Sequence, residues 1–160
     1  MEIERKFLVD KIPFSLDSYK KKEISQGYLC TNPVLRIRKS NDEYRVTYKG
    51  EGLVSREEYD LPFSKEGFYR LVSSVDGALI EKTRYLIPFG KYTIELDVFH
   101  GDYEGLIMAE VEFEDLEECE GFAPPEWFGE DVSESGLFQN SKLCRYSRAE
   151  REKLLREHTL

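Results

Sequence analysis

The chain has 160 residues, a length typical of one domain, and 40% of its residues are hydrophobic. Its aromatic content of 13%, with ten Tyr and ten Phe, excludes a disordered chain, which would be poor in aromatic residues. A net charge of −9 argues against bulk nucleic-acid binding, which needs a basic face, but leaves room for a small anion in a local basic pocket.

Most of the chain alternates between apolar and polar residues with a period of two, which is typical of β-strands. The runs predicted as strands are residues 2–9, 24–30, 34–40, 43–49, 54–61, 79–87, 91–99 and 106–114. The residues predicted to form turns between them are Asn41-Asp42, Gly50 to Gly52, Phe89-Gly90 and Gly101-Asp102. Because the connections are mostly short, eight such strands predict an antiparallel sheet that closes into a barrel.

Two stretches have helical periodicity instead. Ser64 to Val75 carries an apolar face, with Ser64 as the expected N-cap and Gly77 as the expected stop. The tail at about 141–158 predicts a C-terminal surface helix with a thin apolar stripe. The acidic segment 115–135 is expected to be irregular. We therefore predict a single domain over residues 1–160 that is mainly β (α+β), with flanking helices and a C-terminal helix.

Charged side chains gather on one face of nearly every predicted strand. Residues i and i+2 of a strand share a face, so Arg36 lies beside Arg38 and Lys82 lies beside Arg84. An ordinary half-exposed sheet also has one polar face. These polar positions, however, are almost all ionisable and are sorted by sign, whereas a face made for solubility mixes both signs. The opposite faces are strongly apolar and need cover, which the helices and contacts between protomers in a homodimer could supply.

If the sheet closes, the charged faces line its interior. The basic residues on these faces are Lys6, Arg36, Arg38, Lys49, Arg56, Lys82 and Arg84, and the acidic ones are Glu2, Glu4, Glu58, Glu95, Asp97, Glu110 and Glu112. Such an interior must be wet or filled by charged ligands, because each unpaired dry ion costs several kcal/mol. Carboxylates without histidine suit Mg²⁺ or Mn²⁺, and Arg and Lys suit phosphate oxygens. Together they favour a polyphosphate with its metal.

Several short motifs follow one another in order along the chain. Residues 2–6 read Glu-x-Glu-x-Lys at the extreme N-terminus. The further motifs are Gln26 to Leu29, Leu35 to Arg38, Thr47 to Lys49, Arg56 to Tyr59, Lys82 to Tyr85, Glu95 to Phe99, Ala109 to Glu112 and Asn140 to Leu143. As an ordered set over roughly residues 1–146, they resemble the CYTH superfamily, also called the triphosphate tunnel metalloenzymes.

The resemblance implies an eight-stranded antiparallel tunnel with a charged lumen and a divalent-metal-dependent triphosphatase, most often of inorganic triphosphate. Its implied catalytic residues are Glu2, Glu4, Lys6 and Glu112. Its implied ligands for Mg²⁺ or Mn²⁺ are Glu2, Glu4, Glu110 and Glu112, while Glu58, Glu95 and Asp97 could bind a second metal or orient the bases. The substrate-binding residues would be Lys6, Arg36, Arg38, Lys49, Lys82 and Arg84, and the charge alternation adds Arg56. Tyr28 is a candidate gate, or equally an aromatic residue of the barrel rim.

Other functions fit parts of the same pattern. A class IV-type adenylyl cyclase would need an adenine pocket, which we do not find in the sequence, and a thiamine triphosphatase would share the phosphate site. A non-catalytic module that binds polyphosphate or nucleotide would need the bases but not the paired acids. A β-domain used for protein contacts would show no metal dependence.

The cysteines, the histidines and the lengths of the apolar runs limit the possible metal sites and the location of the protein. Cys30, Cys119 and Cys144 are widely spaced and form no zinc motif, so free thiols are expected. His100 and His158 are too few for a histidine-rich metal centre. No signal-peptide pattern and no run of about 18 apolar residues occurs, so we expect a cytoplasmic protein without a membrane span.

Overall fold

The alternating segments form nine antiparallel strands in the computed structural model, which describes residues 1–158. The strands are β1 (Glu2–Leu8), β2 (Lys20–Thr31), β3 (Val34–Ser40), β4 (Glu43–Lys49), β5 (Ser55–Arg56), β6 (Glu58–Pro62), β7 (Asp76–Phe89), β8 (Tyr92–Phe99) and β9 (Ile107–Glu112). Their order in the sheet is β5-β1-β9-β8-β7-β2-β3-β4-β6. The predicted strand positions are therefore confirmed.

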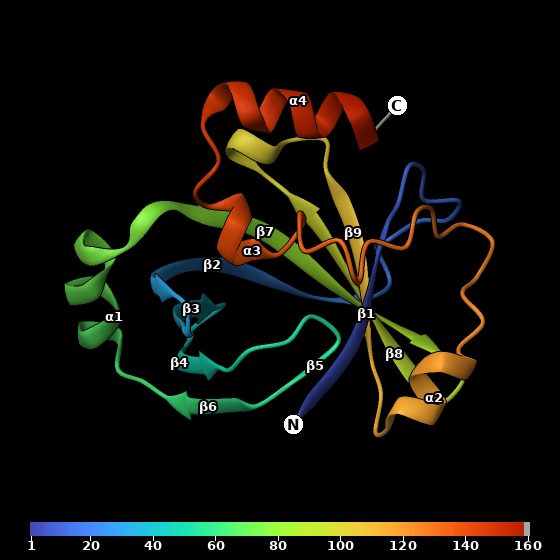
Figure 1. Ribbon diagram of the computed structural model, residues 1–160, viewed down its shortest axis with the longest axis horizontal. Coiled ribbons are helices and arrows are strands. Elements are labelled where there is room, and N and C mark those ends of the chain that lie inside the picture. The colour runs from blue at the N-terminus through green and yellow to red at the C-terminus, as the bar shows by residue number, and fades with distance from the viewer. Residues whose placement is uncertain (159–160) are drawn as a thin grey trace.

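The two ends of the sheet are the short strands β5 and β6, which follow each other in the chain and nearly close the barrel. Only Glu57 separates them, and its carbonyl accepts a hydrogen bond from Gly50 N at 2.9 Å, which extends the β4–β6 register by one residue. β5 pairs with β1, and β6 pairs with β4. The predicted strand at 54–61 thus occurs as two halves, which is why nine strands are found where eight were expected. Figure 1 shows β1, β8 and β9 facing β3, β4 and β6 across the nearly closed barrel.

Hairpin turns form where the sequence predicts them. Asn41 and Gly90, which join β3 to β4 and β7 to β8, have positive φ angles of 53° and 60°. These left-handed conformations are those that Asn and Gly adopt most readily. The turn chemistry therefore keeps sequential strands adjacent and antiparallel, so that inward positions stay in register around the barrel.

The first helical region is shorter than predicted. Helix α1 (Lys65–Leu71) is followed by the 3₁₀ turn η1 (Val72–Ser74), and Ser64 Oγ caps α1 by accepting from Gly67 N at 2.8 Å. The predicted N-cap is confirmed, but the predicted stop is wrong. Gly77 lies inside β7 with φ of 77°, where a Cβ would come within 2.1 Å of the Cys144 carbonyl oxygen. Its conformation serves this close approach and not the end of a helix.

The C-terminal part contains two helices and not one. The predicted helix at 141–158 is interrupted between α3 (Asn140–Leu143) and α4 (Arg148–His158). Ser147 and Glu150 explain the interruption, because each side chain accepts a hydrogen bond from the other's backbone N–H, at 3.1 and 3.0 Å. This capping box starts a new helix at α4. Residues 159 and 160 of the predicted domain lie outside the described residues.

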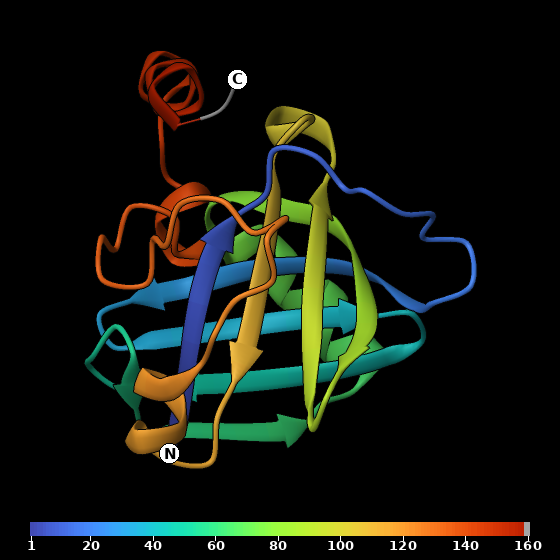
Figure 2. The same ribbon diagram turned by 90° about the vertical axis from the view of Figure 1, so that its right-hand side faces the viewer.

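Segment 115–135 is irregular as expected, except for helix α2 (Leu116–Gly121). Asp115 caps this helix, since its side chain accepts from Glu118 N at 2.8 Å. The chain then crosses the outer face of β1, as Figure 2 shows, and Asp131 forms an isolated bridge to Phe7. A further 3₁₀ turn, η2 (Gly101–Tyr103), links β8 to β9.

The apolar core lies around the barrel and at one of its ends. One cluster covers the outer faces of β1, β8 and β9, where Phe7, Ile94 and Val111 pack beneath residues such as Phe122. A second cluster, with Phe99, Phe138 and Leu143, fills the end of the barrel next to α3. The lumen between them is left to charged side chains, which confirms the predicted inside-out alternation. No helix within residues 1–158 is long and apolar enough to cross a membrane.

Candidate active site

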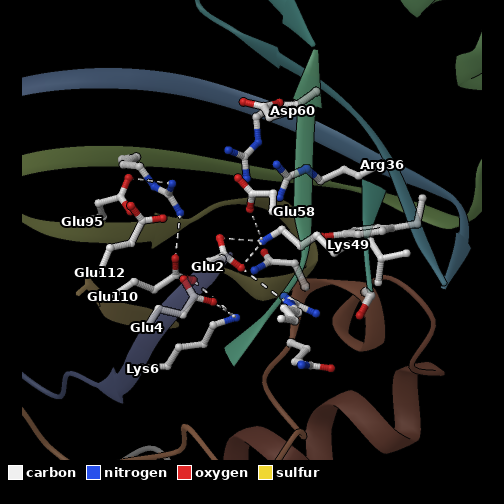
Figure 3. Close-up of a pocket in the computed structure, with 18 residues that line it drawn as sticks. Glu2, Glu4, Lys6, Arg36, Lys49, Glu58, Asp60, Glu95, Glu110 and Glu112 are labelled. Atoms are coloured by element: carbon white, nitrogen blue, oxygen red, sulfur yellow. Dashed lines mark hydrogen bonds and ion pairs between the residues drawn. The ribbon is translucent and has the colours of Figure 1, made fainter. Parts of the chain in front are cut away.

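The interior of the barrel contains a cavity of about 290 Å³ whose walls are almost entirely charged or polar. Its lining residues are Glu2, Glu4, Lys6, Tyr28, Val34, Arg36, Arg38, Lys49, Arg56, Glu58, Asp60, Arg84, Glu95, Glu110, Glu112, Gln139, Asn140 and Ser141. Figure 3 shows Glu4, Glu110 and Glu112 on one side and Arg36 and Lys49 on the other. The structure thus brings the predicted site residues together, with the exceptions of Lys82 and Asp97.

Three carboxylates converge at the start of β1 and the end of β9. One oxygen from each of Glu2, Glu4 and Glu112 lies within 4.8 Å of the others. Burial, together with the nearby carboxylates of Glu95 and Glu2, raises the pKa of Glu112 to about 7. A divalent cation would relieve this repulsion, and carboxylate oxygens without nitrogen or sulfur ligands are what Mg²⁺ and Mn²⁺ prefer. The three residues therefore fit a hard divalent cation.

Glu2 and Glu4 differ in their other contacts. Glu2 accepts from Lys49 Nζ at 2.9 Å and faces Arg56 Nε at 3.5 Å. Among residues 1–158, the only cation within ion-pair distance of Glu4 is the Lys6 ammonium, at 3.6 Å. Burial and the neighbouring Glu110 raise the pKa of Glu4, so its charge is only partly compensated by the protein itself.

Glu110, a predicted metal ligand, lies between two cations and outside the three-carboxylate cluster. Its carboxylate oxygens are 3.6 Å from Lys6 Nζ and 3.3 Å from Arg84 Nη2. Burial alone would raise the pKa of Glu110, but these charges hold it far below the ordinary range. Glu110 therefore orients Lys6 and Arg84 in this structure.

Two further carboxylates border the cavity next to basic residues. Glu58 Oε2 lies 3.3 Å from Lys49 Nζ, and Glu95 Oε2 lies 3.0 Å from Arg84 Nη1. Both carboxylates are partly exposed, unlike the carboxylate of Glu110. Their positions at the cavity wall agree with either of the two predicted roles, a second cation site or the orientation of bases.

Arg36 and Arg38 face the cavity without an acidic partner. Neither forms an ion pair with any of residues 1–158, and Arg36 Nε is buried without a hydrogen-bond partner. Burial and the charges of Arg36 and Arg84 lower the pKa of Arg38 to about 9. Buried cations left uncompensated in this way are costly unless an anion joins them. The pair is therefore suited to bind an anionic ligand.

Lys82 and Asp97 lie behind the cavity wall. Lys82 Nζ is 2.7 Å from Asp97 and donates to Asn140 Oδ1 at 3.2 Å, and Arg84 forms a two-point contact with Asp97 at 2.7 and 2.9 Å. Burial lowers the pKa of Lys82 to about 8, even though Asp97 opposes the shift. These contacts make Asp97 the anchor that holds the Arg84 guanidinium in place.

We expect Asp97→Asn to destabilise the protein by about 3–5 kcal/mol at pH 7, because it leaves the buried Lys82 without its carboxylate partner and removes one of the three carboxylates that contact Arg84. Burial opposes ionisation of Asp97, but Arg84 and Lys82 hold its pKa below the ordinary value, so this contribution is fully present at pH 7 and declines in acid. Urea unfolding in chelator measures the effect. Glu95→Gln is the matched control, since Glu95 pairs with the same Arg84 from a partly exposed site and should cost about 1 kcal/mol or less. Equal losses for the two variants would contradict the anchor role.

Some lining residues were not predicted. Asp60 has the same alternation as Arg56 and Glu58 within the predicted strand 54–61, a signal that was present in the sequence. Gln139, Asn140 and Ser141 reach the cavity only because α3 docks against the barrel, where Tyr103 donates to the Leu143 carbonyl at 2.7 Å. No strand periodicity could show this.

The candidate gate Tyr28 lies in the cavity wall and belongs to the apolar cluster at the α3 end. Its side chain is 3% exposed, and its hydroxyl accepts from Gln26 Nε2 at 2.9 Å. Burial raises the pKa of this hydroxyl. The packing around Tyr28 is that of a fixed wall residue.

Comparison with known proteins finds a matching family profile, similar sequences and a similar fold. The profile of the CYTH domain matches residues 1–147. The chain is 40% identical over 148 residues to an inorganic triphosphatase of Nitrosomonas europaea, covering 89% of this chain and 96% of the relative. It is 35% identical over 153 residues to an inorganic triphosphatase of Acetivibrio thermocellus, covering 90% and 93%. Its fold is similar to the crystal structure of the inorganic triphosphatase NE1496, with a TM-score of 0.68, 36% identity and coverage of 92% and 96%.

Proposed function

We propose that this chain, which belongs to the CYTH domain family, hydrolyses inorganic triphosphate to diphosphate and phosphate with a divalent cation in its barrel. The family match confirms the resemblance that the ordered motifs indicated. The observation that carries the proposal is the arrangement of the cavity: three carboxylates converge opposite two guanidinium groups that form no ion pair with any of residues 1–158. A triphosphate together with its metal complements both groups of charges.

The proposed substrate site consists of Arg36 and Arg38, assisted by Lys6 and Lys49. Arg36 and Arg38 are free to pair with phosphate oxygens, whereas Lys6 and Lys49 already contact acids and would share their donors with the substrate. Arginine binds two phosphate oxygens at once and so fixes the direction of the chain of phosphates. These residues would neutralise charge and align the terminal phosphorus for attack.

Glu2, Glu4 and Glu112 would hold the cation, which when bound neutralises developing charge on the phosphate oxygens. In the proposed reaction a water oxygen forms a bond to the terminal phosphorus, the bond from that phosphorus to its bridging oxygen breaks, and diphosphate leaves. The water gives its proton to a carboxylate, for which Glu112 is our candidate because it borders the cavity. No covalent enzyme intermediate is needed.

A screen of phosphate release tests this assignment. Inorganic triphosphate, thiamine triphosphate and ATP are each incubated with Mg²⁺, Mn²⁺ or Ca²⁺, and orthophosphate, diphosphate and cyclic AMP are measured. We expect equimolar diphosphate and phosphate from inorganic triphosphate, and no reaction in chelator. Cyclic AMP as the main product would favour a cyclase, and tight binding without turnover would favour a non-catalytic binding protein.

Metal binding should depend on pH through Glu112. Because the pKa of Glu112 is about 7, protons compete with the cation below that value and not above it. We expect the affinity for Mn²⁺ to fall up to about tenfold for each pH unit below 7, as competition by one proton requires. Free Mn²⁺ measured by electron paramagnetic resonance between about pH 5.5 and 8 gives the curve. Glu112→Gln should bind more weakly with a flatter curve, and an unchanged curve in that variant would rule Glu112 out as the titrating ligand.

A further inference from the structure

Three adjacent strands place Arg36, Thr47 and Asp60 in one row across the barrel wall. Arg36 of β3 pairs with Thr47 of β4, and Thr47 pairs with Asp60 of β6. Because residues paired directly across an antiparallel sheet point to the same side, all three side chains face the lumen. Thr47 is fully buried between the other two.

Hydrogen bonds join the row in one direction. Thr47 Oγ1 donates to Asp60 Oδ1 at 2.8 Å and accepts from Arg36 Nη2 at 3.1 Å. A threonine hydroxyl has a single proton, so donating it to Asp60 turns the lone pairs of Oγ1 toward Arg36. Asp60 Oδ2 accepts from Arg45 Nε at 2.9 Å, which engages the second carboxylate oxygen. Every member of the row therefore has a defined orientation.

The row holds Arg36 without neutralising it. The Thr47 hydroxyl lies between the guanidinium and the nearest carboxylate of the row, and Arg36 forms no ion pair with any of residues 1–158. Arg36 Nε stays buried and without a hydrogen-bond partner. A direct contact with a carboxylate would have fixed the guanidinium equally well but would have compensated its charge, as Asp97 does for Arg84.

We propose that Thr47 and Asp60 are positioning residues that fix the plane of the Arg36 guanidinium, so that its free donors meet a phosphate oxygen of the substrate. Neither residue touches the substrate in this role, and both act through Arg36. The inference rests on the proposed function for the identity of the anion, inorganic triphosphate. Figure 3 shows Asp60, Arg36 and Lys49 along the same side of the cavity.

Thr47→Val tests the proposal, because it keeps the shape of the side chain and removes the hydroxyl. We expect KM for triphosphate to rise about tenfold, the usual worth of a hydrogen bond to a charged group, with a smaller change in kcat. Thr47→Ser, which restores the hydroxyl, should stay within about threefold of the wild type. The matched control is Thr83→Val, since Thr83 Oγ1 also donates to a carboxylate, that of Glu23, at 2.8 Å but outside the cavity. It should leave KM unchanged.

A double variant separates positioning from a general structural effect. In Arg36→Met protein, adding Thr47→Val should raise KM no further, because the residue through which Thr47 acts is gone. An additive loss in the double variant, or wild-type kinetics for Thr47→Val alone, would overturn the proposal. If Thr47→Val does not fold, Asp60→Asn replaces it in the same comparison, with the same direction expected.

Binding measurements distinguish failure of this inference from failure of the proposed function. Calorimetric titration of triphosphate into metal-free protein reports the anion site without turnover. Absence of turnover in the wild type would refute the proposed reaction, yet about tenfold weaker binding by Thr47→Val would still support the positioning role. Equal binding by both proteins would refute the positioning role whatever the turnover.

Discussion

Replacing Glu4 with glutamine is expected to lower turnover of triphosphate by about a hundredfold or more, since a bound metal supplies several kcal/mol of transition-state stabilisation. The change removes one of the three carboxylates that lie within 4.8 Å of one another. Affinity for Mn²⁺ should fall in parallel, by at least about tenfold. The reason is specific to Glu4, because Lys6, at 3.6 Å, is the only cation among residues 1–158 that lies within ion-pair distance of its carboxylate.

The fold should survive this substitution. Burial and Glu110 already raise the pKa of Glu4, so a neutral amide of the same shape costs little or even removes repulsion. Lys6 keeps its second partner, Glu110, at 3.6 Å. Glu57→Gln is the control, because Glu57 is exposed and absent from the cavity lining. Normal turnover of Glu4→Gln at saturating metal would remove the carboxylate cluster from the mechanism.

Replacing Arg36 with methionine should weaken triphosphate binding without lowering the free energy of unfolding. Loss of a charged donor to phosphate should weaken triphosphate binding by about tenfold to a hundredfold. The free energy of unfolding without ligand should stay the same or rise by about 1 kcal/mol, because an uncompensated buried cation and an unpaired Nε disappear. The methionine keeps the apolar stem that packs against the wall. Calorimetry and urea unfolding give the two quantities.

Arg84→Met is the natural contrast. Arg84 lines the same cavity but contacts Asp97, Glu95 and Glu110 at 2.7, 3.0 and 3.3 Å. Its removal takes one cation from each of these carboxylates, leaving the buried Asp97 with Lys82 and Glu110 with Lys6, so we expect a loss of about 3–5 kcal/mol of stability. If both variants lost stability to a similar extent, Arg36 would be part of the framework, and its assignment as a ligand-binding residue would be wrong.

The alternation of charge was enough to predict which residues point inward. Arg36, Arg38 and Glu4 all face the lumen, because period two in an antiparallel barrel assigns each residue to one face. The same rule applied one step further along the strand of Arg56 and Glu58 would have found Asp60. The resemblance to a family added the roles, which residue alternation alone does not specify.

Depth along the barrel could not be predicted in the same way. Lys82 and Asp97 have the inward parity, yet they lie behind the cavity wall beside the apolar cluster that fills the α3 end. Asn140 reaches this region from a segment distant in sequence, through its contact with Lys82. Periodicity states which face a residue occupies, whereas its position along the axis depends on how the chain outside the sheet packs.

The central claim is that one enclosed cavity binds a triphosphate and a divalent cation at the same time. Its most direct test is a crystal structure with Mn²⁺ and a triphosphate analogue whose bridging oxygens are replaced by NH groups, which resists hydrolysis. We predict an anomalous manganese peak beside Glu2, Glu4 and Glu112, with phosphate oxygens on Arg36 and Arg38. Manganese or phosphate density on the outer surface, with the cavity holding only water, would contradict the account.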